Sequence, residues 1–258
     1  MKKLWNNFVV AFSMYSKIPM PRADWNKENM KYALCFFPWV GAVIGLLEFG
    51  WFQLALLLNF GLIFRSGIMV LIPLIVTGGI HADGLLDTAD ALSSWREKER
   101  RLEILKDSHA GAFAVIIGIG YFIAAFAAAS EVSGETIKVL VFGFAFSRTC
   151  SAISVNHFPN ANPKGTAATF GHNAEKRNVD IVMFLYLVLI CISACLISPI
   201  CGLVLILCGF GAFLFYYKLA MKYFGGITGD LAGFFVCVCE LTMLLGLVIC
   251  ERIQVLLL

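Results

Sequence analysis

The sequence predicts an all-α integral membrane protein, a polytopic helical bundle of about seven spans. Three observations indicate this class. Hydrophobic residues make up 60% of the 258 residues and charged residues 14%, whereas soluble domains carry roughly 25% charged residues. Apolar runs long enough to cross a bilayer recur along the whole chain. Lys and Arg are concentrated in alternate connections between these runs, a pattern typical of multi-pass membrane proteins.

Seven apolar runs predict the spans, and counts of six or eight also fit the pattern. The runs are residues 33–58, 66–80, 109–129, 139–155, 180–197, 201–221 and 231–250. The second run is short and contains Pro73, so we expect a kink there, or a continuation past Gly78 and Gly79 as an interfacial helix. Residues 5–18 predict an interfacial amphipathic helix rather than a span.

Basic residues orient the chain. With a cytoplasmic N-terminus, 16 of the 20 Lys and Arg residues lie on the cytoplasmic side and three on the opposite side, while Arg148 falls inside a span. We therefore expect this orientation, which places the polar segments 78–109, 156–179 and 222–230 together at the cytoplasmic face. No linker or internal repeat divides the chain, so we expect a single membrane-embedded catalytic domain over residues 1–258.

Several classes of function are excluded. A net charge of +3 without a basic-aromatic stripe does not indicate nucleic-acid binding. The nine cysteines form no C-x-x-C pair and lie mostly in apolar runs, which favours packing in a reduced setting and no zinc site. The sequence contains no P-loop, nucleophile elbow or H-E-x-x-H motif.

Gly41 and Gly45 predict a close helix–helix contact.

Three carboxylates carry the strongest chemical signal. On a helix, Asp83, Asp87 and Asp90 are spaced i, i+4 and i+7 and share one face. Such carboxylates repel one another unless a cation neutralises them, and oxygen ligands suit Mg²⁺ bound together with substrate phosphates. The alternative is a solvated acidic helix start. His81 would point to a different face, so we expect it to bond a ligand or support the site rather than bind Mg²⁺ directly.

Two further polar segments precede predicted spans. Lys106, Asp107 and Ser108 come before the third span and predict a phosphate cradle, with a plain Ser108 helix cap as the alternative. Thr228 and Asp230 lie in a glycine-rich segment before the last span, where Asp230 would add a metal ligand. The alternative there is a flexible turn with Asp as a helix cap.

Two basic residues are candidates for phosphate binding. Arg148 lies within a predicted span, where a charged side chain needs a partner. It would bind a substrate phosphate through its planar fork, or pair with Glu48 or Glu240. Lys164 lies in a polar loop that would close over a ligand or remain solvated.

These residues resemble a known family. The segment GGIHADGLLDTADAL resembles the signature of the cobalamin synthases, the adenosylcobinamide-GDP ribazoletransferases of bacterial inner membranes. Matching segments follow the family order along essentially the whole chain: Ser16-Lys17-Ile18-Pro19, FPWVG, KDSHAGAF, the Arg148 span, KGTAATF and GGITGD. One position differs from the family pattern: the family commonly has Arg where this chain has His109. That weakens a phosphate role for His109, whereas Asp107 keeps its place.

The resemblance implies a reaction. Enzymes of this family transfer cobinamide phosphate from adenosylcobinamide-GDP to α-ribazole or its 5′-phosphate, releasing GMP, and require Mg²⁺. The acceptor's ribose 3′-hydroxyl attacks the phosphorus nearer cobinamide. An Asp not bound to metal, or His81, would accept the hydroxyl proton.

Carried onto this chain, the resemblance assigns candidate roles. Catalytic candidates are Asp83, Asp87, Asp90 and His81. Candidate Mg²⁺ ligands are Asp83, Asp87, Asp90, Asp107 and Asp230. Candidate phosphate ligands are Lys106, Ser108, Arg148, Lys164 and Thr228. We expect a multi-pass protein of the bacterial inner membrane with cytoplasmic active-site loops. A homo-oligomer and association with other cobalamin-assembly enzymes stay open.

Three alternatives use similar residues. A CDP-alcohol phosphotransferase also places Asp residues on a pyrophosphate, but its D-G-x-x-A-R spacing is absent here. A membrane prenyltransferase presents Asp motifs to a diphosphate and would be distinguished by its products. A transporter would place its charged residues at the bilayer midplane, whereas these Asp residues cluster at one face.

Overall fold

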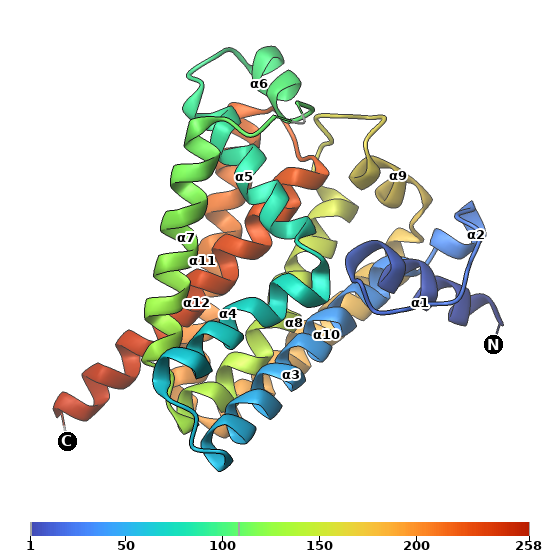
Figure 1. Ribbon diagram of the computed structural model, residues 1–258. Helices are drawn as coiled ribbons and strands as arrows, with labels where there is room; N and C mark the ends of the chain where they lie inside the picture. The colour runs from blue at the N-terminus through green and yellow to red at the C-terminus, as the bar shows by residue number, and fades with distance from the viewer. Residues whose placement is uncertain (1, 108, 258) are drawn as a thin grey trace.

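The computed structural model describes residues 2–107 and 109–257, which are helical almost throughout and contain no strand beyond one isolated bridge. The helices are α1 (Lys2–Tyr15), α2 (Lys27–Met30), the 3-10 helix η1 (Ala33–Phe36), α3 (Phe37–Leu57), α4 (Leu62–Thr77), α5 (Ile80–Ser93), α6 (Lys98–Ile104), α7 (Ala112–Ser130), α8 (Gly134–His157), α9 (Thr166–Asn173), α10 (Lys176–Ile197), α11 (Pro199–Tyr223) and α12 (Gly229–Leu257). Figure 1 shows the long helices side by side, with α6 and α9 at one end of the bundle.

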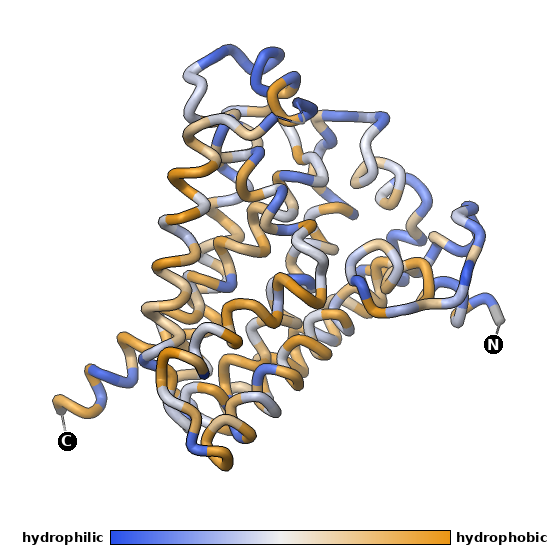
Figure 2. Tube along the Cα trace, in the orientation of Figure 1, coloured by the Kyte–Doolittle hydropathy of each residue, from blue (hydrophilic) through white to orange (hydrophobic). Residues whose placement is uncertain are grey.

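Six helical segments in the described chain are long and apolar enough to cross a membrane: Lys27–Leu57, which contains α3, and α7, α8, α10, α11 and α12. The pair α4 and α5 would form a seventh span, bent by 95° at its centre. The prediction of six to eight spans is therefore confirmed, and the chain is a multi-pass membrane protein. Hydrophobic residues cover the long helices, while hydrophilic residues gather at α6 and in the loops around α9 (Figure 2).

Helix α8 forms the centre of the bundle. In its most apolar window 78% of the residues are buried, compared with 17% in α10, which faces outward. Helix α3 packs directly on α8, because Gly41 and Gly45 let the two backbones approach. A Cβ added at Gly41 would lie 2.8 Å from the Cα of Ala145, and one at Gly45 would lie 3.2 Å from the Cα of Val141. The predicted close helix contact is confirmed.

The break between α4 and α5 positions the acidic helix. Gly78 and Gly79 both have positive φ, 64° and 82°, a conformation that glycine adopts without strain. The chain turns sharply at these residues, and α5 then runs between α7 and α12 toward α6 (Figure 1). Pro73 lies inside α4, one turn before the break. Of the two expected alternatives, the chain thus shows the continuation past Gly78 and Gly79 as a second helix, while its interfacial position stays a prediction.

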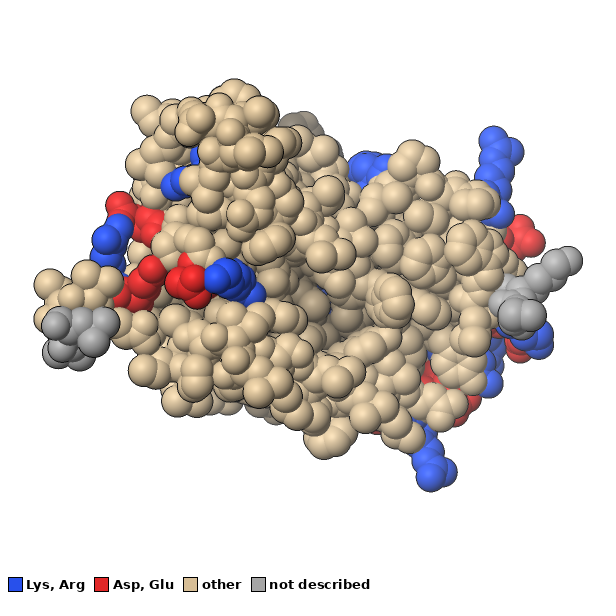
Figure 3. All heavy atoms as spheres, turned by 90° about the horizontal axis from the view of Figure 1, so that it is seen from below, with Lys and Arg blue, Asp and Glu red and all other residues tan. Residues whose placement is uncertain are grey.

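Helix α1 covers part of the predicted interfacial segment and is not among the candidate spans of the described chain. One face of α1 is buried against the bundle through Val9, Val10 and Phe12, while Trp5 is exposed. Seen from below, the molecule presents a broad uncharged surface, with most Lys, Arg, Asp and Glu side chains toward its two ends (Figure 3).

Candidate active site

Three carboxylates from two helices meet where α5 passes the start of α12. Asp83 and Asp87 come from α5, and Asp230 lies in the first turn of α12. The helices approach closely because position 84 is glycine: a Cβ there would lie 2.9 Å from the Cα of Asp230. The negative charges of Asp83, Asp230 and Asp90 all bear on Asp87. These four residues form what we call the acidic face, and Asp83 is its exposed member.

Asp90 is bonded to a neighbouring helix, whereas Asp230 accepts a hydrogen bond of 3.4 Å from the Thr228 hydroxyl at its own helix start. Oδ1 of Asp90 accepts a hydrogen bond of 3.0 Å from the backbone N–H of Ala114, and its Oδ2 accepts one from the N–H of Gly111. These N–H groups belong to the start of α7, where a negative charge is stabilised by the helix dipole. Asp90 therefore caps α7 from the neighbouring helix and joins α5 to it.

The glycine-rich turn before α12 meets a second loop. The N–H of Ile227 donates to the carbonyl of Pro159 at 2.8 Å, and the N–H of Ala161 donates to the carbonyl of Ile227 at 2.9 Å. Thr228 accepts from the N–H of Leu231 at 3.2 Å and caps α12. The structure thus brings the 156–179 and 222–230 segments together. Lys164 is exposed in the first of these loops.

Two lysines lie over glycines near this region, and no role was predicted for either from the residues alone. A Cβ at Gly225 would lie 2.6 Å from the Cε of Lys98, and a Cβ at Gly78 would lie 2.9 Å from the Cδ of Lys17. The sequence did offer a signal for Lys17, because it belongs to Ser16-Lys17-Ile18-Pro19, a segment that matches the family. Lys98 sits in the charged α6, where sequence alone does not distinguish it from its solvated neighbours.

The segment before α7 is arranged differently from the acidic face. Asp107 accepts a hydrogen bond of 3.0 Å from the backbone N–H of His109 and lies 2.8 Å from the His109 ring nitrogen Nδ1. The His109 N–H and ring hold the pKa of Asp107 below its usual range. Asp107 is not among the described charges that bear on Asp87. Lys106 is exposed, and Ser108 lies outside the described residues.

Arg148 is fully buried in α8 and pairs with Glu240 of α12. Its guanidinium also donates to the carbonyl of Phe144 at 2.9 Å and contacts the hydroxyl of Ser147 at 3.1 Å. The Ser147 hydroxyl in turn donates to Glu240 at 2.9 Å. The structure therefore shows the ion-pair alternative for Arg148, while a contact with a substrate phosphate stays a prediction.

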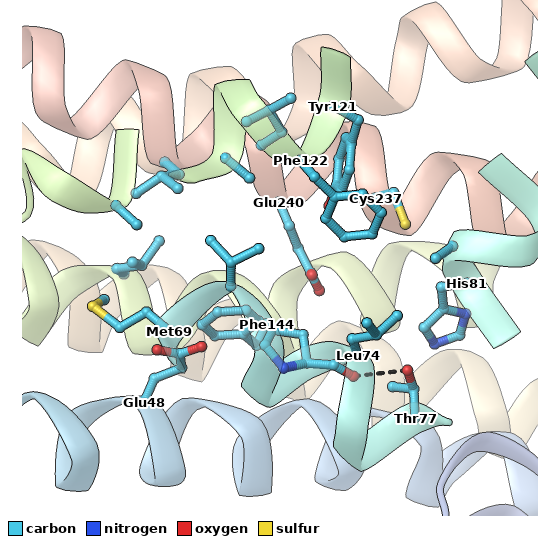
Figure 4. A pocket seen from close by; sticks show the side chains of 18 of the residues that line it. Glu48, Met69, Leu74, Thr77, His81, Tyr121, Phe122, Phe144, Cys237 and Glu240 are labelled. Carbon is cyan, nitrogen blue, oxygen red and sulfur yellow. Dashed lines mark hydrogen bonds between the residues drawn. The ribbon is translucent and has the colours of Figure 1, made fainter. Parts of the chain in front are cut away.

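Arg148 and Glu240 line a cavity inside the bundle, together with Glu48 of α3 and His81 of α5. Figure 4 shows the Glu240 carboxylate and the His81 ring around this space, with Tyr121 and Phe122 on the opposite wall from Glu48. His81 is buried and lies away from the acidic face, as expected from its position two residues before Asp83. The structure thus places Asp83, Asp87, Asp90 and Asp230 on the acidic face and His81 and Arg148 at the intramembrane cavity, while Lys106, Asp107 and Lys164 belong to neither.

The carboxylates of the acidic face fit Mg²⁺ only when a second molecule, such as a phosphorylated substrate, supplies further oxygen ligands. Within the described residues, no group of three or more His, Cys, Asp or Glu side chains is close enough to hold a metal ion by itself. Carboxylate oxygens of Asp83, Asp87 and Asp230 are nevertheless the type that Mg²⁺ prefers, and Mg²⁺ commonly takes one or two carboxylates plus phosphate oxygens. The acidic face therefore fits Mg²⁺ that arrives with a phosphorylated substrate.

Comparisons with known proteins identify the family of the chain. The model of a family described as cobalamin-5-phosphate synthase matches residues 7–248. A protein of Lachnoclostridium phytofermentans named adenosylcobinamide-GDP ribazoletransferase is 45% identical, over 97% of this chain and 96% of its own length. Proteins with the same name from Clostridium botulinum strain Alaska E43 and Geobacillus sp. strain WCH70 are 33% and 30% identical, over 93% and 92% of this chain and 96% and 92% of their own lengths. No solved structure matches the chain.

Proposed function

The chain belongs to the cobalamin-5-phosphate synthase family, and on that premise we propose that it is an Mg²⁺-dependent adenosylcobinamide-GDP ribazoletransferase. It transfers the cobinamide phosphate of adenosylcobinamide-GDP to α-ribazole or its 5′-phosphate and releases GMP, a late step of cobalamin biosynthesis. The observation that carries the proposal beyond the family is the acidic face, because a diphosphate is the substrate group that such a face would bind through a cation.

Mg²⁺ would be held by Asp83 and Asp87, with Asp230 across the Gly84 contact. When bound there, the ion would neutralise the diphosphate and act on it as a Lewis acid. Asp90 would contribute charge while it caps α7. The Asp107 carboxylate is bonded to His109, so the geometry favours Asp107 as an Mg²⁺ ligand less than it favours Asp83 and Asp87.

The chain's own groups would orient the substrate phosphates. The start of α12 lies at the acidic face, and free N–H groups of a helix start attract phosphate oxygens. Thr228 is placed at this helix start, and Lys98 lies over the same turn at Gly225. The burial of His81 away from the acidic face supports an Asp carboxylate, rather than His81, as the group that accepts the ribose hydroxyl proton.

We further propose that the protein lies in the inner membrane with the acidic face toward the cytoplasm. The distribution of Lys and Arg supports this orientation. The GDP-activated substrate is charged, so a site at the cytoplasmic end would receive it from the aqueous phase without membrane crossing.

Asp87→Asn tests the proposal, because it removes one charge with little change in volume. We expect the folded protein to be retained and GMP release to fall by about two to three orders of magnitude, since a metal-centred electrostatic contribution is lost. The assay uses purified protein in detergent with adenosylcobinamide-GDP, α-ribazole and Mg²⁺. Asp24→Asn is the matched control, because Asp24 is exposed and outside the acidic face.

Removal of Mg²⁺ by a chelator should abolish GMP release, and added Mg²⁺ should restore it. Partial rescue of Asp87→Asn by raised Mg²⁺ or by Mn²⁺ would support a ligand role. A well-folded Asp87→Asn protein with normal turnover and normal Mg²⁺ dependence would contradict the proposal. Product analysis separates this reaction from other diphosphate chemistries, which would not yield GMP together with the joined corrinoid.

A further inference from the structure

The intramembrane cavity lies between α3, α4, α5, α7, α8 and α12. The centres of water-sized groups can occupy about 90 Å³ of it, so the space available to the atoms of a ligand is larger than this volume. Most of its wall is apolar, including Met69 and Leu74, and three aromatic residues contribute to it: Tyr121, Phe122 and Phe144 (Figure 4). An apolar wall with a few polar groups is typical of a site for a small organic ligand.

Three polar atoms in the cavity lining have no hydrogen-bond partner among the described residues. They are Oε2 of Glu48, Nε2 of His81 and Nε of Arg148. The three residues are only 2%, 7% and 0% exposed, so solvent does not supply partners freely. Buried polar groups of this kind are costly unless they bond to something, and three of them around one cavity indicate a polar ligand or ordered water.

The cavity adjoins the acidic face. His81 and Ala82 line it, and Asp83 is the next residue of α5. On the α7 side, a Cβ at Gly118 would lie 2.6 Å from the side chain of Leu86, and Tyr121 begins the cavity wall one turn further on. The rest of a ligand held in the cavity would therefore need to reach only the next turn of α5 to meet the carboxylates.

We propose that this cavity binds the aromatic base of the acceptor nucleoside, with its ribose at the acidic face. The inference rests on the proposed function and identifies where that reaction's acceptor is recognised. Ribazole is a ribosylated benzimidazole: its bicyclic ring is flat and largely apolar, and it has one free ring nitrogen that accepts a hydrogen bond. Nε–H of Arg148, or Nε2–H of His81, is the donor for that nitrogen.

The other substrate parts fit the cavity less well. A corrinoid is far larger than about 90 Å³. Guanine carries more donors and acceptors along its edges than the three unpartnered atoms of the wall could pair. An apolar cavity for the base would also explain why a membrane helical bundle catalyses a reaction whose substrates come from the aqueous phase.

A cavity-filling variant tests the proposal. Ala125 lines the cavity and is 8% exposed, so Ala125→Leu narrows it. We expect kcat/KM for the riboside of 5,6-dimethylbenzimidazole to fall about tenfold more than that for the riboside of unsubstituted benzimidazole, since about tenfold or more separates ligands differing by a methyl-sized group. The KM for adenosylcobinamide-GDP should not change. Ala127→Leu is the matched control, two residues away on the exposed side of α7.

A second variant changes the cavity in the opposite direction. Phe122→Leu enlarges it, so the ratio of kcat/KM values should shift toward the larger base, and this measurement stands if Ala125→Leu does not fold. Unchanged base ratios in both variants, or an equal loss for all acceptors, would overturn the proposal. Wild-type GMP release is measured in parallel: its absence would refute the proposed function itself, whereas normal release with unchanged ratios would refute only the base site.

Discussion

Asp83, Asp87 and Asp90 share one face of α5, yet their surroundings differ. Asp83 is exposed, Asp87 is half-buried among three other negative charges, and Asp90 is held by the N–H groups of α7. The same residue type at regular spacing therefore serves two purposes. Asp83 and Asp87 have oxygens available to a cation, whereas Asp90 already stabilises the fold.

Asp90→Ala should lower stability, because the start of α7 loses its cap. We expect a loss of about 1 kcal/mol in the free energy of unfolding, typical of removing a helix cap. Asp83→Ala should leave stability unchanged or slightly raised, since it relieves repulsion on Asp87. Thermal unfolding in detergent measures both. Equal thermal stability of the two variants would contradict the capping role.

Sequence spacing alone predicted the shared face of these carboxylates, because i, i+4 and i+7 positions fix it. It could not predict the cap, which depends on α7 lying beside α5. The same limit applies to Arg148: the sequence offered Glu48, Glu240 and a phosphate, and only the packing of α8 against α12 selects Glu240. Asp107 shows the converse, since a local bond to His109 competes with the predicted ligand role.

At the scale of elements, α5 is positioned by three glycines. Gly78 and Gly79 provide the positive φ values of the break, and Gly84 provides the contact with α12. The sequence offered a kink at Pro73 or a continuation past the glycine pair, and the structure places the break at the glycines. The bend of 95° could not be predicted, because it is set by the packing of α5 between α7 and α12.

Gly84→Ala should reduce activity by separating α5 from the start of α12. The added Cβ meets backbone of Asp230, which cannot rotate away as a side chain would. A shift of about 1 Å in catalytic groups can cost about 100-fold, so we expect a fall of about tenfold to 100-fold in GMP release.

Gly120→Ala is the matched control for Gly84→Ala. Gly120 is an exposed glycine in α7, and an added Cβ there meets no atom of the described chain within 4 Å. Because Ala favours helix by up to about 1 kcal/mol over Gly, this control should be neutral or stabilising. Similar activity in the two variants would show that the α5–α12 spacing is unimportant for catalysis.

At the scale of the whole molecule, most surface charges lie at the two ends, while Glu48, Arg148 and Glu240 are enclosed in the bundle. Hydrophilic segments gather around α6 and α9, and the uncharged surface lies between the charged ends (Figures 2 and 3). The composition and the apolar runs were sufficient to predict this class. They could not predict which loops touch, such as the pairing of Ile227 with Pro159 and Ala161, because those contacts join segments far apart in the chain.

The orientation of the bundle can be tested by labelling single cysteines after replacing the nine native ones. Glu99 in α6 and Glu135 in the first turn of α8 are both exposed, and they belong to opposite sides in the predicted topology. In intact cells a membrane-impermeant thiol reagent should label Glu135→Cys and not Glu99→Cys, since Lys and Arg favour a cytoplasmic α6. Both variants should react after permeabilisation, which shows that each thiol is accessible. Labelling of Glu99→Cys in intact cells would reverse the topology and place the acidic face outside, away from its nucleotide-derived substrates.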